Sequence, residues 1–86
     1  MYKKYMQMLR ETVIDCVIAT NQTYVESLKN KNAFDKDAQL EAFKLSYNAV
    51  MEILSDDAKN YLDSAVGDLE TYITKLIEAQ VKINKE

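Results

Sequence analysis

The chain contains no proline and only one glycine, Gly67, among its 86 residues. These two residue types most often end helices or open turns, so their scarcity leaves long segments free to be helical. Apolar residues recur at steps of three and four through most of the sequence, which is the spacing of amphipathic helices. We therefore expect an all-α protein that forms a single helical domain over residues 1–86.

The first predicted helix covers residues 2–29 and is long for a chain of this size. A helix of this length extends for about 40 Å, which is more than the rest of a small domain can cover. Part of its surface is therefore expected to contact another chain. Its apolar stripe includes Met6, Leu9, Val13, Val17 and Tyr24.

The second predicted helix covers residues 36–54, with Asp35 as its N-cap. Its apolar residues follow one another at steps of three and four over two heptads, which is the pattern of a coiled-coil seam. They are Leu40, Phe43, Tyr47, Val50 and Leu54.

Two shorter helices are predicted over residues 56–66 and 68–85. Ser55 and Asp68 are suitable N-caps, and Gly67 between the helices is a suitable C-cap. The apolar stripe passes through Gly67 almost in register, so one bent helix over residues 56–85 is the alternative. The stripe of the last helix includes Leu69, Tyr72 and Leu76.

Together these patterns predict a bundle of three to four helices with a long first helix, completed by oligomerisation. We call the stripe residues of the three longer helices the predicted seam. They are the candidates for the core of the bundle or for its contact with another chain.

Composition excludes the common catalytic and metal-binding units. Histidine is absent and Cys16 is the only cysteine, so the chain lacks a Ser-His-Asp triad, a histidine-bearing zinc site and a disulfide. One glycine is too few for either glycine-rich phosphate loop. Cys16 lies on the apolar stripe and is expected to be buried and inert. We expect a protein that is not an enzyme, with no catalytic residue, no cofactor and no metal.

Charge and hydropathy limit the partners. Eleven basic and fourteen acidic residues are well mixed and give a net charge of −3, which does not suit nucleic-acid binding. The longest uncharged stretch, residues 16–25, is far shorter than the roughly 20 residues that a spanning helix needs. Lys3 and Lys4 are not followed by the apolar region of a signal peptide. We expect a cytoplasmic protein that does not enter a membrane by this chain alone.

Several stretches resemble small phage and prophage proteins of Firmicutes that are grouped with the LLH-type phage holins. The resemblance covers about residues 9–85 and rests on helix caps and apolar stripes rather than on catalytic residues. The similar stretches are residues 21–29, 33–43, 54–58, 67–70 and 77–81.

The resemblance implies a self-associating helical module from a holin-like lysis protein, in which a membrane-spanning helix precedes the helical region. This sequence lacks such a helix, so the chain is expected to act at the inner face of the membrane only where an anchor precedes it. The alternative is a small acidic phage protein that binds and inhibits a host or defence protein. Its basis is the small size, the acidity and the absence of catalytic groups.

Overall fold

The structure, a computed structural model, describes residues 1–85, with side chains described for residues 1–83. These residues contain helices and no strands, which confirms the predicted all-α class. When the first three helical segments are counted as one continuous rod, the described residues form four helices. The segments are α1 (Tyr2–Thr20), η1 (Asn21–Val25), α2 (Glu26–Asn30), α3 (Lys36–Ile53), α4 (Asp56–Val66) and α5 (Leu69–Lys85).

The first rod consists of α1, a π-helical turn η1, and α2. A π-helix contains more residues per turn than an α-helix, so it rotates the residues that follow relative to those that precede. The buried position after Thr20 is therefore taken by Val25, five residues later, and the seam residue Tyr24 is only half-buried. The rod thus keeps an apolar residue facing inward although the periodicity of the sequence changes.

The connection from α2 to α3 is a short turn held by its backbone. The Ala33 amide donates to the Leu28 carbonyl at 2.8 Å, and Asn32 adopts a φ of 55°. The Asp35 carboxylate then accepts a 2.9 Å hydrogen bond from the Ala38 amide. This bond satisfies one of the free amides of the first turn, and it confirms Asp35 as the N-cap of α3.

The chain forms separate helices on the two sides of Gly67. Gly67 has a φ of 89°, a value that L side chains rarely adopt, so α4 ends there. The Asp68 carboxylate accepts hydrogen bonds from the Thr71 amide at 3.2 Å and from its hydroxyl at 2.8 Å. At the start of α4, Ser55 accepts from the Ala58 amide at 3.1 Å. The predicted caps therefore delimit two helices rather than one bent helix.

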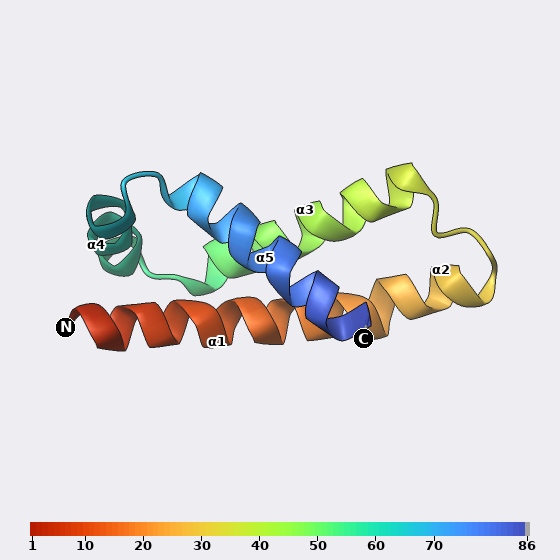
Figure 1. The fold of residues 1–86 in the computed structure, drawn as a ribbon, viewed down its shortest axis with the longest axis horizontal. Coiled ribbons are helices and arrows are strands. Elements are labelled where there is room, and N and C mark those ends of the chain that lie inside the picture. The colour runs from red at the N-terminus through yellow and green to blue at the C-terminus, as the bar shows by residue number, and fades with distance from the viewer. Residues whose placement is uncertain (86) are drawn as a thin grey trace.

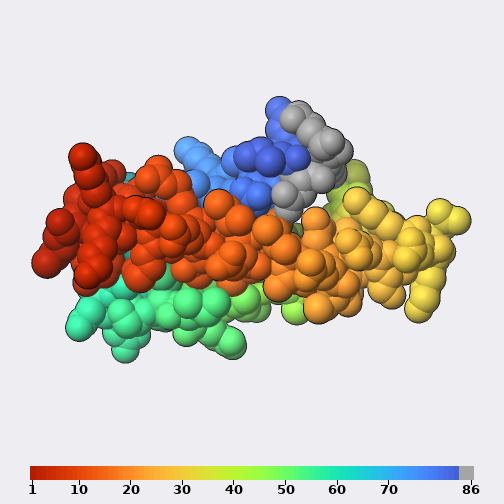
Figure 2. All heavy atoms as spheres, turned by 90° about the horizontal axis from the view of Figure 1, so that it is seen from below, coloured from red at the N-terminus to blue at the C-terminus, as the bar shows by residue number. Residues whose placement is uncertain are grey.

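The rod of α1, η1 and α2 runs along the length of the molecule, and α1 packs against α3, α4 and α5 (Figure 1). α5 crosses both α1 and α3. Seen from below, the rod runs across the near face, with the later part of α3 along one edge and α5 along the other (Figure 2). The centre of the core lies between these helices and contains fully buried Leu9, Val13, Val50, Leu62, Ile73 and Ile77.

The inward faces of α3 and α5 follow steps of four residues. On α3 the buried residues are small over most of the row, and they are Ala38, Ala42, Ser46 and Val50. On α5 they are Leu69, Ile73 and Ile77. Small side chains let two helices approach closely, so the first half of α3 packs through them rather than through bulky seam residues.

The predicted seam is distributed over three environments. Its buried members are Met6, Leu9, Val13, Val17, Val50, Leu54 and Leu69. Its half-buried members are Tyr24, Phe43, Tyr47, Tyr72 and Leu76. Leu40 is 54% exposed, because Ala38 and Ala42 take the inward positions on its part of α3. On α3 the predicted seam thus departs from the contact face at Leu40, whereas Phe43 and Tyr47 pack against the core and Val50 and Leu54 are part of it.

Candidate functional site

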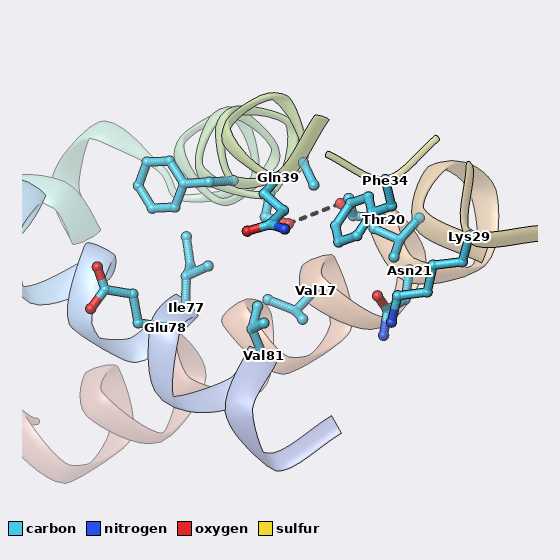
Figure 3. A pocket seen from close by; sticks show the side chains of 13 residues that line it. Val17, Thr20, Asn21, Lys29, Phe34, Gln39, Ile77, Glu78 and Val81 are labelled. Atoms are coloured by element: carbon cyan, nitrogen blue, oxygen red, sulfur yellow. Dashed lines mark hydrogen bonds between the residues drawn. The ribbon is translucent and has the colours of Figure 1, made fainter. Parts of the chain in front are cut away.

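A cavity of about 240 Å³ lies where the rod, the first half of α3 and the end of α5 meet. Figure 3 shows it from close by, with Val17, Ile77 and Val81 on one side and Phe34 and Gln39 on the other. η1 contributes Asn21 and Val25 to its wall. The π-helical turn thus helps to shape the cavity, in agreement with the frequent occurrence of such turns at functional sites.

The wall of the cavity is mainly apolar. Val17 and Ile77 are members of the main core. The neighbouring aliphatic and aromatic groups of the wall come from each of the surrounding segments. They are Val25, Phe34, Ala42, Phe43 and Val81. Such a wall, with few polar groups, is typical of pockets that bind small apolar molecules.

Two buried hydroxyls form the polar part of the wall. The Ser46 hydroxyl donates a 2.9 Å hydrogen bond to the Thr20 hydroxyl, which joins α3 to α1. Ser46 is 3% exposed and Thr20 is 8% exposed. Buried hydroxyls need a partner, and here each is the partner of the other. Neither residue belongs to the predicted seam; the signal in the sequence was the row of small residues at steps of four.

Charged groups lie at two ends of the cavity. Lys29 is at one end, beside the amide of Asn21, and Glu78 is at the other (Figure 3). The Lys29 ammonium lies 5.6 Å from the centroid of the Phe34 ring, within the range of a cation–π contact. This contact holds the cation beside the apolar wall.

Exposed apolar side chains form a second feature of the surface. Ile14 and Ile18 lie one turn apart on α1, which places them on one side of the helix. Further exposed apolar residues lie on the N-terminal segment, α1, α3 and α5. They are Met1, Tyr2, Met8, Leu40, Leu45, Ile53, Val81 and Ile83.

Among the described residues, three titratable groups have shifted pKa values, and the causes of the shifts are burial, neighbouring charges and a helix cap. Burial, and then the charge of Asp15, raises the pKa of the Cys16 thiol, which disfavours a nucleophilic thiolate. Burial, followed by the charges of Glu70 and Asp68, raises the pKa of Tyr47. The hydrogen bonds from Thr71 lower the pKa of Asp68. Each shift follows from packing or capping.

Residues 1–85 contain no group of three or more histidine, cysteine or acidic side chains placed to hold a metal ion. In the same part of the chain, no helix is both long enough and apolar enough to cross a membrane.

Comparison with known proteins found no matching family model, no matching curated protein and no matching solved structure. The relation to holin-like phage proteins therefore stays a prediction, which rests on the stretches of sequence described above. The site must be interpreted from its own geometry.

Proposed function

We propose that this chain is a non-enzymatic helical module that associates with further copies of itself. The observation that carries the proposal is the pair of exposed isoleucines, Ile14 and Ile18, on the longest rod of the molecule. Side chains one turn apart form a continuous apolar strip, which is more favourable when another helix covers it.

The size of the chain supports this proposal. A domain of 86 residues buries roughly 60–65% of its unfolded surface and gains stability when association buries more. Apolar side chains on α1 and α3 are exposed in the single chain, among them Leu45 and Ile53. A second copy that packs against the rod would bury such surface without any new catalytic group.

The first experiment is light scattering coupled to gel filtration over roughly a hundredfold range of concentration. We expect a mass of two or more chains. Ile18→Lys should shift the mass toward a single chain, because it places a charge in the apolar strip. Asn60→Lys is the matched control, since it makes the same charge change at an exposed residue of α4.

The far-ultraviolet circular dichroism of both variants should be unchanged, which separates dissociation from unfolding. A single-chain mass for the wild type at every concentration would refute self-association. The alternative, a small acidic protein that inhibits a host or defence protein, would then be the hypothesis to test.

We further propose that the module belongs to a holin-like phage lysis protein, and this part of the proposal rests on the sequence resemblance alone. Its test is to fuse a membrane-spanning helix ahead of Met1 and to follow the growth and lysis of the host cells. Lysis with the fusion, but not with the anchor alone or with an Ile18→Lys fusion, is the expected result. Equal growth of all three cultures would contradict a holin-like role.

A further inference from the structure

The cavity between the rod, α3 and α5 has an apolar wall that extends the main core, since Val17 and Ile77 belong to both. Val25, Ala42 and Val81 lie outside the core cluster, yet all three face the cavity. Val25 is nearly fully buried although it packs beside this open space. A small apolar molecule would therefore find a wall that is already formed, with an opening to solvent at its rim.

The buried hydroxyl pair selects the chemistry of such a molecule. Two hydroxyls joined by one hydrogen bond retain one proton between them for a third group. The bond between Ser46 and Thr20 leaves that proton in the wall of the cavity. A ligand with an oxygen acceptor would use it, whereas a purely apolar ligand would leave it unpaired at a cost.

The charged residues at the two ends of the cavity determine which charge a ligand can carry at each end. The Lys29 ammonium is held beside the Phe34 ring at one end, and a negative group there would gain from its charge. Glu78 at the other end (Figure 3) disfavours a second negative group. The arrangement fits a molecule with one anionic end and one apolar end.

We propose that this cavity binds a medium-chain fatty acid, with its carboxylate at the Thr20, Ser46 and Lys29 end and its alkyl chain against Ile77 and Val81. The cavity volume of about 240 Å³ is below the usual range of roughly 300–1,000 Å³ for drug-sized ligands. The ligand is therefore short, and octanoate is the probe.

The test is a titration of the full chain with octanoate, octanol and octylamine, followed by calorimetry and by amide chemical shifts. The three probes share one chain length and differ in charge. Octanoate should bind about fivefold more tightly than octanol, because Lys29 favours the anion. Octylamine should bind least, and the amide shifts along the alkyl chain should centre on Ile77 and Val81.

Two variants test the polar end of the cavity. Removal of both hydroxyls, Ser46→Ala together with Thr20→Val, should lower the affinity for octanoate about tenfold, the effect of one hydrogen bond to a charged group. Lys29→Gln should remove the preference for octanoate over octanol. Its matched control is Lys31→Gln, which makes the same charge change at an exposed residue of the adjacent turn and should leave the preference intact.

A third substitution tests the apolar part. Ala42→Leu places a larger side chain in the wall and should abolish binding, whereas Ala79→Leu on the exposed surface of α5 should not. If Ala42→Leu does not fold, Val81→Phe provides the same test at the half-open rim.

Absence of saturable octanoate binding to the wild type would overturn the proposal. Binding that is unchanged in both the Ser46→Ala, Thr20→Val double variant and Lys29→Gln would also overturn it, because the ligand would then be elsewhere. Light scattering of the same samples reports self-association separately, so failure of one proposal leaves the other open to its own test.

Discussion

The Ser46 hydroxyl hydrogen bonds to the Thr20 hydroxyl at 2.9 Å, although the two residues are 26 positions apart. The bond joins the first half of α3 to the end of α1, where the π-helical turn begins. It lies in a row of small residues that lets the two helices approach. The contact between these helices therefore has a polar anchor within an apolar surface.

Ser46→Ala is expected to destabilise the fold by about 1–2 kcal/mol, because the Thr20 hydroxyl loses its buried partner. Thr20→Val should cost a similar amount. The double variant should cost less than the sum, since it leaves no unpaired hydroxyl. Urea unfolding of all four proteins measures this coupling, and strictly additive costs would contradict it.

Ile73→Ala is expected to cost about 3 kcal/mol, the usual effect of removing a buried branched side chain. Ile73 is 0% exposed, whereas Ile83 on the same helix is 61% exposed. Ile83→Ala is thus the matched control and should change the unfolding free energy by less than about 0.5 kcal/mol. Equal costs in urea unfolding would contradict the orientation of α5.

Gly67→Ala is expected to destabilise the chain by about 1–2 kcal/mol through backbone strain. A Cβ at this position would have no neighbour within 4 Å, so the effect comes from the φ of 89° alone. Ser64→Ala in α4 is the control and should be nearly neutral. An unchanged melting temperature for Gly67→Ala would show that the helices do not separate at this residue.

Cys16 is expected to react slowly with a thiol reagent at neutral pH. It is buried, and its raised pKa reduces the thiolate. The reaction with a chromogenic disulfide should be at least about a hundredfold slower than that of an exposed thiol, because it requires opening of the fold. A chain with Cys16→Ala and Ser64→Cys supplies the exposed thiol. Similar rates for the two chains would refute the burial of Cys16.

Stability is expected to decrease as the pH rises above about 10. Burial, then the charges of Glu70 and Asp68, raises the pKa of Tyr47 above its ordinary value of 10.0. The folded state therefore holds the phenol proton more tightly than the unfolded state, and this contribution is present below that value and lost above it. Tyr47→Phe should show a smaller loss at high pH than Tyr2→Phe, measured by urea unfolding. An identical dependence would contradict the environment of Tyr47.

Sequence patterns were sufficient for the helical class and for the caps. Asp35, Ser55 and Asp68 were recognisable because capping depends on residues within one turn. Gly67 was recognised as a C-cap but not as a definite break, because the apolar stripe continues through it. The positive φ of Gly67 in the structure shows that α4 ends there.

The contact face of α3 and the cavity were not predictable in the same way. The heptad spacing predicts that Leu40 faces inward. In the structure Ala38 and Ala42 are buried instead, because their small side chains let α3 approach its neighbours closely. That choice depends on the volume available between two helices, which no local pattern contains. The π-helical turn was missed for a similar reason, since burial of Val25 in place of Tyr24 depends on α3 and on the cavity wall.

The π-helical turn also acts as a phase shift in the rod. Deleting one residue within Asn21–Val25 would restore ordinary α-helical winding. A five-residue step around a π-helical turn covers about the same angle as a four-residue step of an α-helix. Val25 would then follow Thr20 at the ordinary four-residue spacing, and the residues after it would keep their present side of the rod and shift mainly along its axis. The same deletion within α1 would instead rotate the residues that follow by about 100° around the rod axis. The rod is therefore expected to tolerate the loss of one residue in the π-helical turn better than in α1.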